Sequence, residues 1–302
     1  MKIAVHCGVN KHFVGDIVEH LKKKHEVRAE ETRTTQELFE LMKWSDVSWF
    51  EWCEQTAITA SHLPKVCRNI VRLHGYEAYL SYPEQIDWNY IDDLIIVSDV
   101  SKKPLKGRVP EDKIKVIHNG VNLDKFTFNK HEKGFNLVCA GYINPRKNNQ
   151  FLLYAMHELL KIDQRYFLHF VGKFQNGEQQ IYLQEAIKKM GIQDHVAFHD
   201  WVKDLNDIHS NMNYIVSASY RETFGYSIAE GMLCGLKPVI HWFDGVESIW
   251  PEKYVFTNME EFIKQITSDE YNSQEYKKYV VDNYSLEKQM RAIDKLIMRG
   301  KK

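Results

Sequence analysis

The chain has 302 residues, and at roughly 150 residues per domain this length predicts two domains. Its 40 Lys and Arg residues nearly balance its 41 Asp and Glu residues, so the formal net charge is −1 and the basic excess of a dedicated nucleic-acid binder is excluded. Hydrophobic residues make up 44% and charged residues 27%, which excludes a disordered chain.

Neither a membrane span nor a secretion signal is predicted. No run approaches the roughly 18 apolar residues that a membrane-spanning helix needs. The first residues lead directly into a strand-like run, without the charged and then apolar layout of a signal peptide. The five cysteines form no Cys-x-x-Cys pair and four of them lie in apolar runs, so we expect buried thiols in a cytoplasmic protein.

Short apolar runs alternate with helical patterns along the first half of the chain. The predicted strands are residues 3–7, 25–29, 47–52, 69–73, 94–98 and 115–118. The helical pattern is clearest over residues 13–24. Its apolar residues at helical spacing are Phe13, Ile17, Val18 and Leu21. The basic run at its end, residues 22–24, favours a solvated helix terminus, with contact to a membrane surface as the alternative.

The second half repeats this alternation. The predicted strands are residues 136–141, 166–172, 196–201, 214–219, 238–242 and 254–257. The helix after the first of them carries an apolar stripe made of Leu152, Ala155, Met156 and Leu159. About six strands in each half, alternating with helices, predict an α/β fold of two doubly wound Rossmann-like domains.

A polar stretch over residues 125–134 separates the two halves. We therefore expect an N-terminal domain over residues 1–125 and a C-terminal domain over residues 126–284. Residues 285–302 follow as a separate segment with a helical stripe. The stripe consists of Leu286, Met290, Ile293 and Ile297.

Ligands of open parallel sheets bind beyond the carboxyl ends of the strands, and four such places carry unusual residues. Gly8 follows the first strand, where a glycine lets backbone amides approach an anion. The turn lacks the Gly-x-Gly-x-x-Gly pattern, which is the main sequence evidence for a nicotinamide or flavin dinucleotide site. His74, beside Gly75, is placed either to reach a cleft or to bond a backbone carbonyl as a structural histidine.

The other two places lie in the second half. Arg146 and Lys147 follow the turn at Gly141 and precede a helix, an arrangement suited to clamping phosphate, although a surface pair would look the same. Glu222 precedes a helix that begins near Gly225, where backbone amides would point at a bound anion.

Glu230 lies inside that helix in an apolar run. A carboxylate in such a run is costly unless something polar meets it. Two exposed glutamates that satisfy the helix dipole would explain Glu222 but would explain Glu230 poorly.

The pattern Glu222-x7-Glu230 with Phe224-Gly225 resembles the signature of retaining glycosyltransferases of family 4, the glycosyl transferases group 1, which have the GT-B fold. Further segments are similar to that family's motifs in the same order: residues 117–126, Gly141 to Asn148, residues 234–239 and, more loosely, residues 245–247. In the first half the similarity is confined to Gly8, His74-Gly75 and residues 93–98.

The resemblance implies transfer of a sugar from a nucleoside diphosphate sugar to an acceptor hydroxyl, with retention of configuration. It implies that Glu222 and His74 lie by the transferred sugar and that Glu230 accepts hydrogen bonds from the ribose. Lys147 and the amides around Gly225 would bind the diphosphate. The expected catalytic residues are Glu222 and His74, and the expected substrate-binding residues are Gly8, Arg146, Lys147, Phe224, Gly225, Tyr226, Ser227 and Glu230.

The resemblance also implies two domains that face a cleft and a last helix, residues 285–302, that packs on the N-terminal domain. We expect the nucleotide sugar as co-substrate, no other cofactor and no metal, since no Asp-x-Asp triad is present and Asp92-Asp93 at a strand start favours a structural role. The acceptor would be a saccharide or a lipid-linked molecule of glycan biosynthesis, with peripheral membrane contact as an option and no nucleic acid partner.

Two departures from the family pattern matter. Tyr142 stands where the family has an arginine, and Arg146 is the candidate replacement. The family's Gly-Gly turn is reduced to Gly8-Val9. Tyr142 leaves open a catalytically silent nucleotide-sugar-binding subunit, and the shared fold leaves a nucleotide-sugar epimerase as a further alternative. The aromatic run Trp49 to Trp52 predicts either a sugar-stacking platform or ordinary core.

Overall fold

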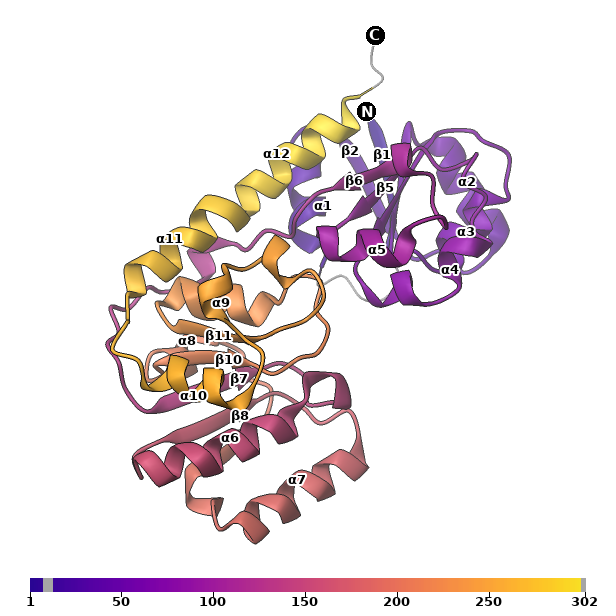
Figure 1. Cartoon of the computed structure of the whole chain (residues 1–302). Helices are drawn as coiled ribbons and strands as arrows, with labels where there is room; N and C mark the ends of the chain where they lie inside the picture. Colours follow the sequence, from indigo (N-terminus) through magenta and orange to yellow (C-terminus); the bar gives the residue numbers. More distant parts are fainter. Residues whose placement is uncertain (8–12, 300–302) are drawn as a thin grey trace. The chain divides into compact units, whose positions relative to one another are not determined.

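The computed structural model of the chain describes residues 1–7 and 13–299 (Figure 1). The chain forms two compact units. The first unit comprises Met1–Asn119 together with Glu287–Lys302, and the second comprises Gly120–Leu286. The expected boundary lay after Lys125, whereas Val121 is held in the second unit because its amide donates to the carbonyl of Tyr284 (2.8 Å) and its carbonyl accepts from Leu286 (2.9 Å).

The first unit is built on a six-stranded parallel sheet. Its strands are β1 (Lys2–His6), β2 (Glu26–Glu30), β3 (Val47–Glu51), β4 (Arg68–Leu73), β5 (Asp93–Ile96) and β6 (Ile114–Val116). They lie in the order β2-β1-β3-β4-β5-β6. Because β1 pairs with both β2 and β3, the chain changes direction across the sheet between β1 and β3, which is the switch point where ligands of such sheets bind.

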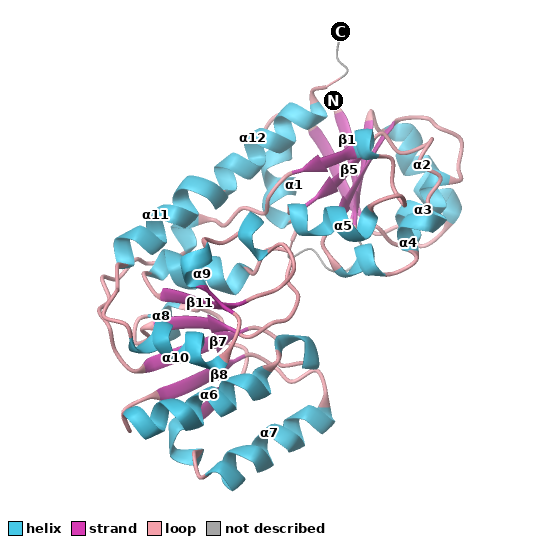
Figure 2. Ribbon diagram, in the orientation of Figure 1, coloured by secondary structure: helices cyan, strands magenta, loops and turns pink. Residues whose placement is uncertain are grey.

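Helices cover both faces of this sheet (Figure 2). They are α1 (Gly15–Lys22), α2 (Thr35–Trp44), α3 (Gln55–Ser61), α4 (Tyr82–Gln85), α5 (Lys102–Leu105) and α12 (Leu286–Ile297). Apolar side chains of α2 and α3 form one core with β3, β4 and β5, in which Phe50, Val71 and Leu94 are fully buried. Burial of such side chains from water stabilises each by about 1.5–3 kcal/mol.

The last helix, α12, is tied to α1 and to the amino end of β4. Asp294 accepts hydrogen bonds from His20 Nε2 (2.9 Å) and Lys24 Nζ (2.7 Å). Arg68 Nη1 donates to the carbonyls of Leu296 (2.9 Å) and Ile297 (3.1 Å) at the helix end. Three of the four residues of the predicted stripe, Met290, Ile293 and Ile297, are buried, and Leu286 is partly buried.

The second unit repeats the architecture. Its strands are β7 (Asn136–Ala140), β8 (Phe167–Val171), β9 (Val196–His199), β10 (Tyr214–Ser217), β11 (Lys237–His241) and β12 (Val255–Phe256). They are parallel and lie in the order β12-β11-β10-β7-β8-β9, so the switch point of this sheet lies between β7 and β10. All twelve predicted strands are therefore present, and the doubly wound α/β prediction is confirmed.

Helices again cover both faces. They are α6 (Asn149–Ile162), α7 (Gly177–Met190), α8 (Asn206–His209), α9 (Tyr226–Cys234), α10 (Met259–Thr267) and α11 (Ser273–Tyr284). The first two and α10 share one core with Tyr214 and Val216 of β10. Ile215, which points to the opposite face, lies against Gly231 of α9, where an added Cβ would come within 2.7 Å of its side chain. The close approach of α9 to β10 thus depends on a glycine.

All five cysteines are free thiols, and all except the half-buried Cys67 are buried, as the sequence predicts. Two of the three lysines of the basic run are paired within the first unit, since Lys22 lies 2.8 Å from Glu19 and Lys24 lies 2.7 Å from Asp294. Within the described part of the chain, no helix has the length and apolar character needed to cross a bilayer.

Candidate functional site

Two loops flank the switch point of the second sheet, one after β7 and one after β10. The first turns at Gly141, whose φ of +125° is readily adopted by glycine. It then forms a 3-10 turn over Pro145–Lys147, which Asn144 caps by accepting from the amide of Lys147 (3.2 Å). This turn places two successive cations, Arg146 and Lys147, at the carboxyl edge of the sheet.

Both cations converge on one carboxylate oxygen of the second loop. Lys147 Nζ lies 2.6 Å and Arg146 Nη1 lies 2.8 Å from Glu222 Oε1. Arg146 also donates to the carbonyl of Arg221 (2.7 Å). The side chain of Glu222 is only 15% exposed. Burial raises its pKa, but the charges of Lys147 and Arg146 outweigh burial, so the pKa of Glu222 stays below its ordinary value and the group is ionised at neutral pH.

The loop then leads into α9 through Phe224 and Gly225. Trp250 Nε1 donates to the carbonyl of Phe224 (3.1 Å), whose ring is buried. Gly225 adopts a φ of +86°, where a side chain would be strained. As the N-cap residue it has no side chain to satisfy the first amides of α9, which include those of Tyr226 and Ser227. The start of this helix is therefore suited to an anion.

Glu230 lies one turn further along α9. It is three and four positions after Ser227 and Tyr226, and so shares a helix face with the first turn. Burial raises its pKa to about 7, against the opposing effect of the Lys125 charge. Among the described residues, no hydrogen bond to its carboxylate is found, so this carboxylate is poised to accept donors from a ligand.

His74 belongs to the first unit, at the carboxyl end of β4. Its Nε2 lies 2.6 Å from Glu51 Oε1, so the expected alternative of a bond to a backbone carbonyl is replaced by a bond to a carboxylate. Arg72 Nη1 (2.8 Å) contacts the same oxygen, and Trp49 Nε1 (2.8 Å) contacts the other. Burial opposes ionisation of Glu51, but Arg72 and His74 lower its pKa to about 2, so Nε2 of His74 carries the hydrogen.

The structure thus brings together Arg146, Lys147 and Glu222 at one place. The start of α9, with Gly225 to Ser227, and Glu230 follow on the same segment of the second unit. His74 lies in the first unit, and Gly8 lies outside the described residues. Tyr142, at the position that the resemblance gives to an arginine, is 47% exposed and its ring lies 5.3 Å from that of Trp201.

Sequence reasoning missed Glu51 and Arg72. The available signal was a pair of charged residues inside two apolar strand runs, which is costly unless the two meet. Their pairing follows from the register of β3 and β4, in which Glu51 stands opposite Arg72. The pattern of residues within one strand does not reveal how that strand is aligned with its neighbour.

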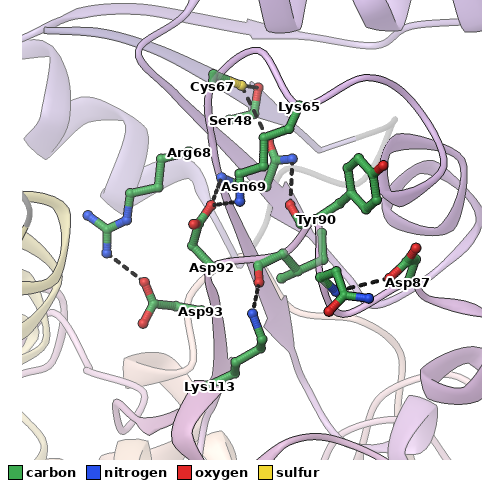
Figure 3. A network of polar contacts seen from close by, with 12 residues as sticks. Ser48, Lys65, Cys67, Arg68, Asn69, Asp87, Tyr90, Asp92, Asp93 and Lys113 are labelled. Carbon is green, nitrogen blue, oxygen red and sulfur yellow. Dashed lines mark hydrogen bonds and ion pairs between the residues drawn. The ribbon is translucent and has the colours of Figure 1, made fainter.

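Asp92 and Asp93 lie at the other edge of the first sheet, among the polar contacts of Figure 3. Asp92 accepts from Lys65 Nζ (2.7 Å) and from the amide of Asn69 (2.7 Å), and Asp93 pairs with Arg68 (2.6 Å). These bonds fit the structural role expected for the two carboxylates. No three His, Cys, Asp or Glu side chains of the described ranges gather as ligands of a metal ion would.

Comparison with known families and proteins agrees with this geometry. Residues 121–268 match the profile of the family described as Glycosyl transferases group 1. The uncharacterized glycosyltransferase MJ1607 of Methanocaldococcus jannaschii is 26% identical over 156 residues, which cover 46% of this chain and 39% of that protein. The match therefore spans well under half of the length of that relative.

Solved structures resemble the whole fold at low sequence identity. Alr3699/HepE of Anabaena, solved with UDP, has a TM-score of 0.82 and 13% identity and covers 98% of this chain and 99% of its own. The same protein solved with UDP-glucose has a TM-score of 0.78. A glycosyltransferase of Rickettsia africae has a TM-score of 0.74 and 17% identity, with 99% of both chains covered. These similarities assign the chain the GT-B fold.

Proposed function

We propose that the chain is a glycosyltransferase that uses a nucleoside diphosphate sugar as donor, a proposal supported by the match of residues 121–268 to the profile of the Glycosyl transferases group 1. The reaction transfers the sugar to an acceptor hydroxyl with retention of configuration and without a metal ion. UDP-glucose bound to the Anabaena protein supports a nucleotide sugar of this kind, although the fold does not specify the base.

The observation that carries the proposal is the convergence of Lys147 and Arg146 on Glu222 beside the start of α9. The two cations lie within 2.8 Å of one carboxylate oxygen, at the switch point of a parallel sheet. A diphosphate placed there would meet both cations and the amides of Tyr226 and Ser227. Cations and helix-start amides are the groups that stabilise negative charge on a departing diphosphate.

The chemistry assigns a role to each group. As the anomeric C–O bond of the donor breaks, the diphosphate gains negative charge, which Lys147, Arg146 and the amides stabilise. The acceptor oxygen forms the new bond on the same face of the sugar, and its proton passes to the departing phosphate oxygen. Glu222 binds the sugar hydroxyls, and Glu230 accepts from the ribose.

The test begins with binding. Thermal shift measurements with UDP, GDP, ADP and CDP should show one of them raising the melting temperature with concentration, since a ligand that binds only the folded chain stabilises it. The matching nucleotide sugar should then release free nucleoside diphosphate when an acceptor is supplied. Absence of stabilisation by all four nucleotides would overturn the proposal.

Tyr142 favours a second candidate function, a nucleotide-sugar-binding subunit without turnover. Its aromatic ring, packed near Trp201, supplies no charge where the resemblance calls for an arginine. Binding of a nucleotide sugar without release of nucleoside diphosphate in the presence of acceptor would select this candidate.

A further inference from the structure

The aromatic run of β3 divides between core and surface. Trp49 and Phe50 are fully buried, so the core interpretation holds for these two residues. Trp52, the first residue after the strand, lies at the carboxyl edge of the sheet and is only partly buried. That edge is the switch point of the first sheet, next to β1.

Trp52 is held in an unusual backbone conformation. Its φ is +86°, in the left-handed region that bulky residues rarely adopt. Its amide still donates to the carbonyl of Arg72 (2.9 Å), which continues the pairing of β3 with β4 by one residue. Glycine would adopt this backbone conformation without strain. The presence of a large indole here therefore indicates that the side chain itself has a role.

Three further rings surround the indole. Its centroid lies 4.1 Å from His74, 5.7 Å from Phe13 and 5.8 Å from Tyr76. Phe13 is 37% and Tyr76 is 42% exposed, so the cluster presents aromatic surface to solvent. We call Phe13, Trp52 and Tyr76 the aromatic platform.

The base of the platform is polar and fixed. His74 is bonded to the buried Glu51, which Arg72 also contacts, and Arg72 Nη2 donates to Asn119 Oδ1 (2.5 Å). The turn that leads to Tyr76 is held by Glu77, whose carboxylate accepts from the amides of His74 and Gly75. The rings therefore stand on a rigid support with a polar group, His74, among them.

We propose that the aromatic platform binds the pyranose ring of a saccharide acceptor, an inference that rests on the proposed glycosyl transfer. A pyranose presents C–H groups on its faces and hydroxyls around its rim. Aromatic faces accommodate the first and leave the second open to water and to polar groups. An alkyl chain offers no hydroxyl beside its C–H groups, whereas the proposed transfer needs a hydroxyl on the acceptor. A platform of partly exposed rings therefore suits a sugar as acceptor.

Saturation-transfer NMR of the full chain with methyl α-D-glucopyranoside and methyl β-D-galactopyranoside tests this. Irradiation of the aromatic protons should transfer saturation to the ring C–H protons of at least one of them. Trp52→Gly suits the left-handed backbone, so it removes the indole without straining the turn. It and Tyr76→Ala should raise the pyranoside Kd about two- to tenfold, the range of one aromatic contact.

Trp52→Phe should keep binding close to that of the unmodified chain, because it keeps an aromatic face. Tyr182→Ala is the control, since Tyr182 is an exposed tyrosine (49%) of α7 in the second unit and lies outside the aromatic platform. No saturation transfer to either pyranoside, or an unchanged Kd in Trp52→Gly, would overturn the inference. Saturation that reaches the base of added UDP through Trp52 instead of a pyranoside would overturn it as well.

The nucleotide experiment keeps the two proposals apart. Thermal stabilisation by a nucleoside diphosphate in Trp52→Gly, equal to that of the unmodified chain, leaves the proposed function standing even where pyranoside binding is absent. Pyranoside binding in a chain that no nucleoside diphosphate stabilises refutes the proposed function and, with it, the acceptor role of the platform.

Discussion

A single oxygen, Glu222 Oε1, serves as counterion to both Lys147 and Arg146. A diphosphate that binds these cations competes with Glu222 for them. Removing the glutamate leaves two cations without their internal partner and so does not remove any group that attracts the anion. Glu230, in contrast, offers its carboxylate without a hydrogen-bonding partner among the described residues.

The two glutamates should therefore respond differently to substitution. Glu230→Ala should weaken binding of the nucleoside diphosphate by roughly ten- to a hundredfold, the effect of losing a hydrogen bond to a charged group, about 1.5–3 kcal/mol. Glu222→Ala should keep that affinity while turnover falls. Calorimetric titration and the transfer rate of each variant measure the two effects.

Melting curves of both variants are the necessary control, because Glu230 lies in a largely buried helix. The assigned roles would be wrong if Glu222→Ala alone lost the nucleotide. They would also be wrong if both variants bound it like the unmodified chain.

The raised pKa of Glu230 makes a further prediction about pH. Burial raises the pKa from 4.5 to about 7, so the folded chain holds this proton more tightly than the unfolded chain. The contribution of Glu230 to stability is therefore fully present below pH 4.5 and is lost as the pH rises through about 7. As the pH rises from 4.5 to about 7, the free energy of unfolding of Glu230→Gln should therefore increase relative to that of the unmodified chain. The increase should be about 1.4 kcal/mol for each pKa unit.

Urea unfolding at pH 5 and at pH 8 measures that difference. Equal stability differences at the two pH values would show that Glu230 titrates normally. Asp163→Asn is a suitable comparison, because Asp163 lies at the surface, its pKa is lowered by Arg165, and the variant should show no such gain on raising the pH.

At the scale of elements, the packing of α9 on β10 leaves no room for a side chain at Gly231. Gly231→Ala would bring a Cβ within 2.7 Å of Ile215, a clash with a branched, buried side chain. Overpacking of this kind costs about 1–3 kcal/mol, so the variant should unfold at lower urea concentration. Because α9 carries Gly225 to Glu230, nucleotide affinity should fall with it.

Gly177→Ala is the matched control, since Gly177 begins α7 and a Cβ there meets nothing within 4 Å. It should be neutral or slightly stabilising, as alanine favours the helix. A stable Gly231→Ala variant with full affinity would show that α9 can shift on the sheet without consequence for the site.

The elements could be predicted from the sequence because each is coded locally. The run from Tyr214 to Ser217 is apolar and ends in small polar residues, and α6 has its stripe at helical spacing. The charged array of the first unit could not be predicted, because Glu51 meets Arg72 only through strand register. The same holds for Trp52, since the left-handed turn that separates it from the buried Trp49 and Phe50 has no local signal.

At the scale of the molecule, the first unit is completed by the last helix. Deleting residues 287–302 removes Asp294 and the carbonyls that Arg68 contacts. It also removes four buried apolar side chains, Met290, Ile293, Leu296 and Ile297. At about 1.5–3 kcal/mol each, these rival the whole stability of a domain, about 5–15 kcal/mol, so the first unit should lose its cooperative unfolding transition.

Calorimetry should show that transition lost while the transition of the second unit, Gly120–Leu286, remains. Arg291→Ala is the control, because Arg291 is exposed on α12 and its ion pair is with Glu287 of the same helix. A truncated chain with the melting profile of the full chain would show that α12 is dispensable.

The pairing of Arg68 with the end of α12 joins residues 228 positions apart in the chain. During synthesis the strands of the first unit leave the ribosome early, but the helix that covers them is made only after all of Gly120–Leu286. At about 5–20 residues per second, that interval lasts roughly ten to thirty seconds. The second unit is one continuous stretch of chain, so its synthesis is complete before that of the first unit. During this interval the nascent first unit exposes the apolar face that α12 later covers. We therefore expect a chaperone to bind this part of the nascent chain.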